Sequence, residues 1–320
     1  EEWRKGWHPE RMQVKGASQK VLVVGAGPAG LEAAHALAKR GYDVALAEAG
    51  GELGGRVALE CKLPGLAAWG RVRDYREYQL SQMANVETYL QSKLSAQDIL
   101  EFGFDSVAIA TGSTWRRDGV ARQHVVPMPV DAGMAIYTPD DLMAGEIPAG
   151  NVVLYDDDHY YMGGVLAELL VQNGAKVTLD TPSAFVSDWT NNTLEQATIH
   201  KHLVEKGVTI RLNRCVRCIA AYHLFTDCVY TGQTETHAAT GVVLVTSRLA
   251  NDELWRALLA RTADWPDAGI TSIKVIGDAE APGPIAWATY AGHRYARELD
   301  MPDIGDALSF RREIAHLSPD

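Results

Sequence analysis

The chain has 320 residues, of which 47% are hydrophobic and 22% charged, and its formal net charge at pH 7 is −11. This length suits two domains, and the acidic balance argues against nucleic acid or an anionic membrane surface as a partner. We find no apolar run long enough to span a bilayer and no secretory signal at the polar N-terminus. Four cysteines do not indicate a disulfide scaffold, so we expect a reducing, cytoplasmic location.

Residues 20–55 form the stretch around which we expect the chain to fold. Residues 21–24 are a continuous apolar run, typical of a parallel strand buried on both faces. The sequence GAGPAG follows at residues 25–30, and residues 31–40 are rich in Ala and Leu, as in a helix. Because residues 42–47 then read as a second strand, this order predicts a βαβ unit with a dinucleotide fingerprint.

Each residue of the fingerprint has an expected role in holding a nucleotide. Gly25 permits the tight turn, Gly27 lets the backbone approach a pyrophosphate, and Gly30 lets the helix pack closely on the strand. Pro28 and Ala29 lie at the N-terminus of the helix, where free N–H groups and the helix dipole favour phosphate.

The carboxylate of Glu48 and the segment after it complete the expected site. Glu48 ends the second strand, near the spacing of roughly 20 residues at which an acid holds the adenosine ribose. A carboxylate there would repel a 2′-phosphate, so NADP is disfavoured. Gly55 would let the backbone pass near the cofactor, and Arg56 is either a phosphate ligand or a surface charge.

The next segments lead to a second strand tip. We expect a helix over residues 68–83 and a buried strand over residues 105–110 that ends in Thr111 and Gly112. Small residues at a strand tip suit the approach of a cofactor. Residues 116–150, with several Pro and Gly, are expected to connect two domains.

A second βαβ unit is expected from residue 151, but its turn differs. A strand from residue 151, a helix over residues 163–173 and a strand over residues 176–180 weakly repeat the first unit. Residues 156–158 are three aspartates in place of glycines, and they would repel a pyrophosphate. We therefore expect this dinucleotide site to be lost. A divalent-ion site is the alternative, although consecutive residues rarely aim three carboxylates at one point.

The remaining pattern predicts a discontinuous first domain. We expect helices over residues 194–206, 253–263 and 284–299, strands over 209–212, 241–246 and 272–276, and a hairpin over 217–230. Because ligands bind outside the carboxyl ends of strands, Gly277 and Asp278 should border the same ligand as Thr111 and Gly112. The expected fold is α/β, with two Rossmann-like parallel sheets of glutathione-reductase type, one inserted in the other. Its parts are an arm (1–17), a nucleotide domain (18–115 plus 268–300), a connection (116–150), an NAD(P)-like domain (151–267) and a second arm (301–320).

Three cysteines and a histidine have the spacing of a zinc knuckle. Cys215, Cys218, His223 and Cys228 follow the pattern C-x2-C-x4-H-x4-C, and four N/S ligands suit tetrahedral Zn²⁺. The flanking apolar residues indicate paired strands, in which Cys215 and Cys218 would point to opposite faces. We therefore expect buried or edge thiols and no metal.

Together these motifs resemble a known family. The chain resembles the C-terminal half of the trimethylamine dehydrogenase-type flavoproteins, which include dimethylamine and histamine dehydrogenases and the demethylases of dimethylglycine. The resemblance covers nearly the whole chain. It is carried by EWRKGWHPE, GAGPAG, GGR, LPGL, DYRE, ATG, DDDHYYMGG, WTNNT, GDAEAP and FRRE.

The resemblance implies more than this chain contains. In such proteins an FMN-bearing TIM barrel oxidises the amine and a [4Fe–4S] cluster takes the electrons, so we expect both groups in a missing N-terminal half or a partner subunit. An electron-transfer flavoprotein or similar acceptor, and an oligomeric assembly, are expected as partners. The first domain would hold ADP or FAD, and the resemblance assigns the nucleotide to Gly25, Gly27, Pro28, Ala29, Gly30, Glu48, Gly55, Arg56, Thr111, Gly112, Gly277 and Asp278.

Three functions remain open at this point. The first is the nucleotide-binding portion or subunit of an amine-oxidising, N-demethylating iron–sulfur flavoprotein dehydrogenase, without the amine site itself. The second is a self-contained FAD-dependent NAD(P)H oxidoreductase, which intact glycines near residues 155–164 would have favoured. The third is a non-catalytic, nucleotide-stabilised scaffold that docks an electron acceptor.

Overall fold

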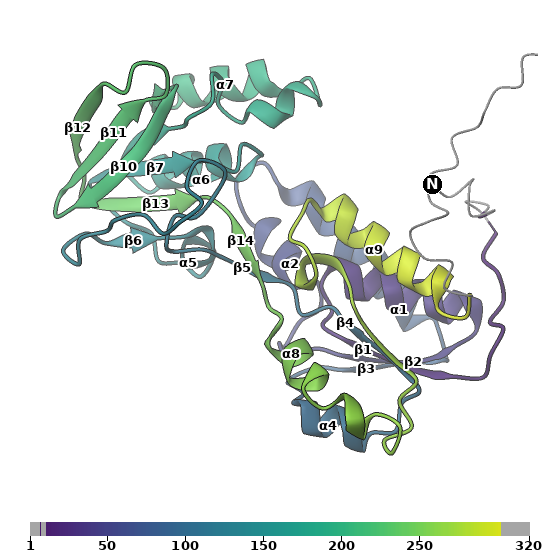
Figure 1. Cartoon of the computed structure of the whole chain (residues 1–320). Coiled ribbons are helices and arrows are strands. Elements are labelled where there is room, and N and C mark those ends of the chain that lie inside the picture. Colours follow the sequence, from purple (N-terminus) through teal and green to yellow (C-terminus); the bar gives the residue numbers. More distant parts are fainter. Residues whose placement is uncertain (1–6, 8–10, 302–320) are drawn as a thin grey trace, which may run out of the picture. The chain divides into compact units, whose positions relative to one another are not determined.

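The computed structural model describes Trp7 and residues 11–301, which fall into two compact units (Figure 1). The first unit takes its described residues from 1–55, 72–112 and 252–301, and the second unit comprises residues 56–71 and 113–251. Most of the two expected arms, including the motif FRRE, lies outside the described residues.

The first unit is built on one parallel five-stranded sheet with the strand order β15-β4-β1-β2-β3. Strand β15 pairs with β4, although the two are far apart in the sequence. The elements of this unit are β1 (Lys20–Val24), α1 (Pro28–Arg40), β2 (Asp43–Ala47), α3 (Arg71–Ser81), β3 (Val86–Tyr89), α4 (Ala96–Glu101), β4 (Ser106–Ile109), α8 (Glu253–Leu259), η3 (Thr262–Asp264), β15 (Ser272–Val275), η4 (Gly277–Ala279) and α9 (Ile285–Glu298).

Helices cover both faces of this sheet (Figure 1). Val21 and Val23 belong to a core with residues of α1 and α9, whereas Leu22 and Val24 belong to a second core with residues of α4 and α8. Successive residues of a strand point to opposite faces, so the continuous apolar run of β1 serves both cores.

The second unit repeats a parallel five-stranded sheet, with the order β6-β13-β7-β8-β9. It also contains a three-stranded antiparallel sheet, β10-β11-β12, and the pair β14-β5. Its elements are α2 (Arg56–Glu60), η1 (Ala67–Gly70), β5 (Ser113–Trp115), β6 (Ile136–Tyr137), α5 (Pro139–Met143), β7 (Asn151–Asp156), α6 (Met162–Gln172), β8 (Lys176–Asp180), η2 (Asp188–Asn191), α7 (Gln196–Glu205), β9 (Thr209–Arg211), β10 (Arg214–Ala220), β11 (His223–Cys228), β12 (Thr234–Ala238), β13 (Gly241–Val245) and β14 (Arg248–Ala250).

The two faces of this second sheet are covered by different structures. Leu154 packs in a core with Leu166 of α6 and Leu203 of α7. Val153, on the other face, packs in a core with Val216 of the three-stranded sheet. Each Rossmann-like sheet is therefore buried on both faces, which confirms the expected α/β fold class with parallel sheets.

The boundaries of the units differ from the expected ones at three places. Residues 56–71 lie in the second unit because Leu63 and Leu66 pack in the same core as Leu166. Residues 252–267 lie in the first unit because Leu258 packs beside Ile99. The expected connection at residues 116–150 contains β6 and α5, and β6 extends the second sheet.

Helices α1 and α9 approach each other closely at a glycine. A Cβ atom at Gly292 would lie 2.1 Å from the backbone oxygen of Ala29, a distance that no side chain could occupy. Gly292 is itself buried in α9. The packing of these two helices therefore depends on a hydrogen in place of a side chain at this position.

We expect the substitution Gly292→Ala to lower the free energy of unfolding of the first unit by about 2 kcal/mol, because overpacking outweighs the gain in helix propensity. Urea unfolding followed by circular dichroism measures this change. Gly164→Ala is the matched control: it lies in helix α6, and its Cβ would meet Ile199 at an ordinary 3.4 Å. Equal stability of the two variants would contradict the prediction.

Candidate functional site

The turn between β1 and α1 packs against the tip of β4. Gly25 has a φ of 101°, in the region that favours glycine, and a Cβ there would lie 2.3 Å from the backbone oxygen of Ala110. A Cβ at Gly30 would lie 1.8 Å from the backbone oxygen of Gly25. The first and third glycines of the fingerprint are therefore required by close backbone contacts.

The second glycine borders open space. Gly27 is the N-cap residue of α1, and a Cβ there would meet no described atom within 4 Å. Among the described residues, no side chain caps this helix, which has Pro28 in its first turn. A helix N-terminus presents backbone N–H groups and the positive end of the helix dipole, so this space suits an anion.

The carboxylate of Glu48 lies beside the same turn. Its Oε2 accepts a hydrogen bond from the backbone N–H of Ala26 at 2.7 Å, and its Oε1 accepts one from Gly50 at 2.7 Å. These two bonds fix the carboxylate next to the glycine turn at the carboxyl end of β2, where a ribose hydroxyl could donate to it.

Two further predicted residues lie close to the turn. A Cβ at Gly55 would lie 2.9 Å from Cα of Gly27, and Gly54 donates its N–H to the oxygen of Ala26 at 2.8 Å. A Cβ at Gly277 would lie 2.5 Å from Cβ of Ala29. The structure thus brings η4, at the tip of β15, against the first turn of α1.

Thr111, Gly112 and Asp278 occupy neighbouring strand tips. Thr111 and Gly112 directly follow β4, and Gly112 has a φ of 77°. A Cβ at Gly112 would meet no described atom within 4 Å. Asp278 accepts a hydrogen bond from the N–H of Gly283 at 3.0 Å, which orders the loop before α9. Because β4 and β15 are adjacent and parallel, both tips lie at the same edge of the sheet.

The guanidinium of Arg56 has partners within the second unit. It donates to the backbone oxygen of Ser113, and its Nη1 lies 3.3 Å from Oδ1 of Asp140. Its Nε lies 3.8 Å from Glu60. A role of Arg56 in binding phosphate therefore stays a prediction, and it would have to coexist with these contacts.

The corresponding turn of the second unit holds buried carboxyl groups. Asp156 and Asp157 are fully buried, and His159 Nε2 lies 3.2 Å from Oδ1 of Asp157. Burial, reinforced by the charge of Asp156, raises the pKa of Asp158 to about 7. Among the described residues, no three His, Cys, Asp or Glu side chains converge as metal ligands would.

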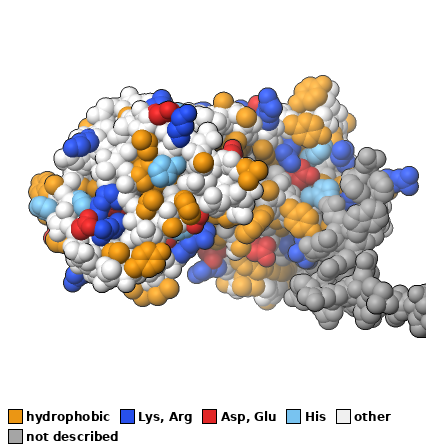
Figure 2. Space-filling model, turned by 90° about the horizontal axis from the view of Figure 1, so that it is seen from above, with side chains coloured by type: hydrophobic (Ala, Val, Ile, Leu, Met, Phe, Trp, Pro, Cys, Tyr) orange, Lys and Arg blue, Asp and Glu red, His pale blue; other side chains and the backbone are white. Residues whose placement is uncertain are grey.

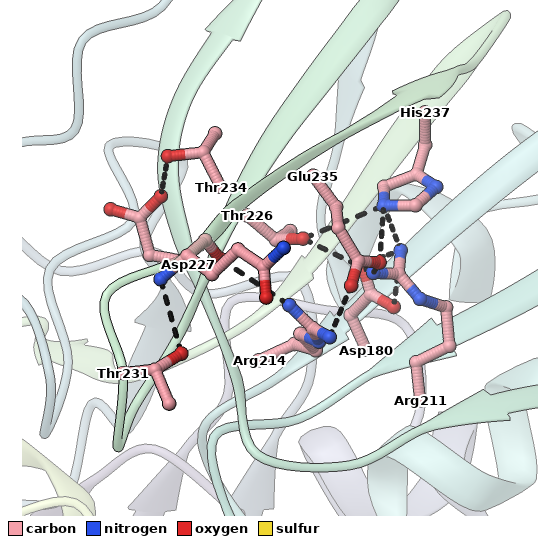
Figure 3. A network of polar contacts seen from close by, with 10 residues as sticks. Asp180, Arg211, Arg214, Thr226, Asp227, Thr231, Thr234, Glu235 and His237 are labelled. Atoms are coloured by element: carbon pink, nitrogen blue, oxygen red, sulfur yellow. Dashed lines mark hydrogen bonds and ion pairs between the residues drawn. The ribbon is translucent and has the colours of Figure 1, made fainter.

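A second polar network lies at the tip of β8 (Figure 3). Asp180 ends β8 as Glu48 follows β2, but Asp180 is fully buried. Arg211 Nη1 lies 3.4 Å from Oδ1 of Asp180, and Arg211 Nη2 lies 2.7 Å from Oε2 of Glu235 on β12. His237 also contacts Arg211. Strand β12 thus supplies partners at the place where a ribose would be held, and sequence reasoning missed this strand.

The knuckle residues lie along the hairpin β10-β11. Cys215 pairs with Asp227, Cys218 with Phe225, and His223 with Ala220. A bulge between Val216 and Cys218 interrupts the regular alternation on which the expectation of opposite faces rested. Cys215 lies 3.4 Å from Nε2 of His124, outside the motif. The absence of zinc stays a prediction.

The surface and the helices add two observations. On the face shown in Figure 2, basic side chains are interspersed with acidic ones. No helix in the described part of the chain has the length and apolar character needed to cross a membrane.

The two parallel sheets and the glycine turn define a fold of the glutathione-reductase type, with two Rossmann-like units. The family model "Pyridine nucleotide-disulphide oxidoreductase" matches residues 19–128, and "OYE-like second alpha/beta domain" matches residues 137–242. The first of these families indicates a flavin- or nucleotide-binding domain.

Comparison with individual proteins shows which members of this fold class the chain is similar to. The chain is 36% identical to dimethylamine dehydrogenase of Hyphomicrobium sp. (strain x), over 98% of this chain and 46% of that protein. It is 65% identical to the structure of histamine dehydrogenase from Rhizobium sp. 4-9, over 100% of this chain and 50% of that one, with a TM-score of 0.97. It is 42% identical to 6-hydroxypseudooxynicotine amine oxidase from Pseudomonas geniculata N1, over 93% and 44% of the chains, with a TM-score of 0.89.

The chain is therefore homologous to the C-terminal part of the dimethylamine and histamine dehydrogenases, which confirms the resemblance inferred from its motifs. These homologues are amine dehydrogenase oxidoreductases. The chain spans about half the length of the relatives that it matches.

The buried carboxyls of the second unit predict a pH dependence of stability. Burial raises the pKa of Asp158 from its usual 3.8 to about 7 and that of Asp180 to about 6. The folded chain thus keeps protons on these two carboxyl groups that the unfolded chain releases. The contribution of the two groups to the free energy of unfolding is therefore fully present below pH 3.8 and is lost as pH rises through about 6 to 7. We expect the free energy of unfolding to fall across this window.

The substitution Asp158→Asn should reduce that fall, because an amide is neutral at every pH in the window. Urea unfolding of the parent protein and of Asp158→Asn at several pH values across the window measures this change in the free energy of unfolding. Glu205→Gln, at a largely exposed carboxyl, is the control and should keep the full pH dependence. The explanation fails if Asp158→Asn keeps it too.

Proposed function

We propose that the first unit binds the adenosine diphosphate group of ADP or FAD at the turn between β1 and α1. The observation that carries the proposal is the open space at Gly27, at the N-terminus of α1 and beside the carboxylate of Glu48. A pyrophosphate suits the first element and a ribose the second, and both lie on one edge of one sheet.

In this proposal each predicted residue has a defined task. Gly25, Gly27 and Gly30, with Pro28 and Ala29 between them, keep the backbone close to the pyrophosphate. Glu48 accepts hydrogen bonds from the ribose hydroxyls. The rest of the nucleotide would be lined by Gly55, Arg56, Thr111, Gly112, Gly277 and Asp278.

We further propose that the chain is the nucleotide-binding portion of an amine-oxidising iron–sulfur flavoprotein dehydrogenase. Its homology to amine dehydrogenases supports this, as does the family description of residues 137–242 as the second domain of an OYE-like protein. In this proposal, FMN and a [4Fe–4S] cluster belong to a TIM-barrel domain or subunit matching the uncovered half of the relatives. An electron-transfer flavoprotein or similar protein accepts the electrons from an oligomeric, cytoplasmic enzyme.

A self-contained NAD(P)H oxidoreductase with FAD is the second candidate. It is favoured by the match of residues 19–128 to the pyridine nucleotide-disulphide oxidoreductases. The buried aspartates at the second turn argue against it, because a second nucleotide would have to bind there. A nucleotide-stabilised scaffold without catalysis is the third candidate. It differs from the proposed portion of an amine dehydrogenase only in the absence of an amine-oxidising partner.

The substitution Gly27→Val should abolish nucleotide binding, because its side chain would fill the open space at the N-terminus of α1. We expect a loss of at least about a hundredfold in affinity, since the phosphates would lose their hydrogen bonds to the helix N-terminus. Mass spectrometry of ligand released from the purified protein identifies ADP or FAD, and calorimetry measures its affinity.

Ala149→Val, at an exposed position of the second unit, adds similar bulk and should leave binding unchanged. Full nucleotide occupancy in Gly27→Val would place the site elsewhere.

We expect the chain to oxidise neither NADH nor NADPH. Buried carboxyl groups take up the second turn, where the phosphates of either cofactor would have to bind, so a dye-linked diaphorase assay should read at background. Robust turnover would support the reductase candidate and would leave the nucleotide site of the first unit unaffected.

A further inference from the structure

The turn between β7 and α6 corresponds to the glycine turn of the first unit. Strand β7 ends at Asp156, and α6, a helix of 11 residues, begins at Met162. In an open α/β sheet, a helix that follows the carboxyl end of a strand presents its N-terminus to the ligand site. No side chain of the described residues caps α6.

The carboxyl group of Asp156 lies at this helix N-terminus. Its Oδ1 accepts hydrogen bonds from the backbone N–H groups of Asp158 at 3.2 Å and His159 at 3.0 Å. Its Oδ2 is buried and has no hydrogen-bond partner among the described residues. His159 has a φ of 68°, which is unusual for a residue other than glycine. In this loop conformation the backbone N–H of His159 points to the carboxyl group of Asp156.

Gly163, in the first turn of α6, makes the room for this carboxyl group. A Cβ at Gly163 would lie 2.6 Å from both Cγ and Oδ2 of Asp156. In the first unit, the equivalent close contact of Gly30 is with the backbone of its own turn, and the space at Gly27 stays open. The two units thus share a glycine in the first helical turn, but in the second the space beside it holds a carboxyl group.

The neighbouring aspartates do not share this position. Asp157 accepts the N–H of Gln123 at its Oδ2 and pairs with His159 at its Oδ1. Asp158 donates its backbone N–H to Asp156, and its backbone oxygen accepts a hydrogen bond from Arg122. A general repulsion by three carboxylates therefore does not describe the turn, since one specific carboxyl group accepts two N–H groups of the turn and fills the space beside Gly163.

We propose that the carboxyl group of Asp156 occupies the place that a phosphate would take between the β7–α6 turn and the first turn of α6, and that this residue excludes phosphate-bearing nucleotides from the second unit. The ligand class that would replace the side chain is inorganic phosphate or diphosphate. This inference concerns the second unit alone and is independent of nucleotide binding by the first.

The test is chemical rescue of Asp156→Ala. Amide hydrogen exchange of a peptide covering residues 157–166 should be about tenfold faster in the variant than in the parent protein, because two N–H groups lose their acceptor. Inorganic phosphate should slow this exchange again in the variant. Sodium chloride at equal ionic strength should not, and neither salt should change this peptide in the parent protein.

Two further variants make the test decisive. Asp156→Asn keeps an oxygen acceptor of the same shape and should exchange like the parent protein, with no response to phosphate. Glu205→Ala, which removes a largely exposed carboxylate of the same unit, controls for net charge and should also behave like the parent. If Asp156→Ala does not fold, Asp156→Ser takes its place, with the same expected response.

Exchange in Asp156→Ala, or in its replacement, that matches the parent protein would overturn the proposal. Faster exchange that phosphate fails to slow would overturn it as well.

Discussion

The first unit depends on a contact between backbones that only glycine allows. Gly30 brings α1 against its own turn, and Gly292 brings α9 against α1. Because both helices are held this closely, η4 reaches the first turn of α1, and Gly277 lies against Ala29. The edge of the sheet at which we propose a nucleotide to bind is thus assembled from segments far apart in the sequence.

The two units show how one βαβ design can differ in its ligand site. In the first unit the acidic side chain, Glu48, lies beside the turn and accepts the N–H of Ala26 from outside. In the second, Asp156 lies within the turn, buried at the helix N-terminus. In our proposals, the position of one carboxyl group, rather than the topology of the sheet, therefore separates an open phosphate site from one that a side chain fills.

The fold class followed from local signals in the sequence, whereas the boundaries of the units did not. A buried run followed by glycines encodes β1 and its turn within a few residues, so pattern reasoning sufficed there. The placement of residues 56–71 depends on Leu63 and Leu66 packing against a distant helix, which no local period reveals. Strand β12, with alternating exposure and a polar sequence, carries too few apolar residues to be predicted. The bulge in β10 likewise has no signal in the pattern.

Because of the polar network around Asp180, removal of the carboxyl group of Asp156 alone would not restore a dinucleotide site in the second unit. A dinucleotide needs both an anion site for its phosphates and an acceptor for its ribose. Asp180 lies where that acceptor belongs, but it is fully buried and paired with Arg211, which β12 holds through Glu235 (Figure 3). Replacing Asp156 would free the place of the phosphates and leave the place of the ribose closed. Phosphate is therefore a suitable probe of the second unit where NADPH is not, and a gain of NADPH oxidation would require rebuilding β12 as well.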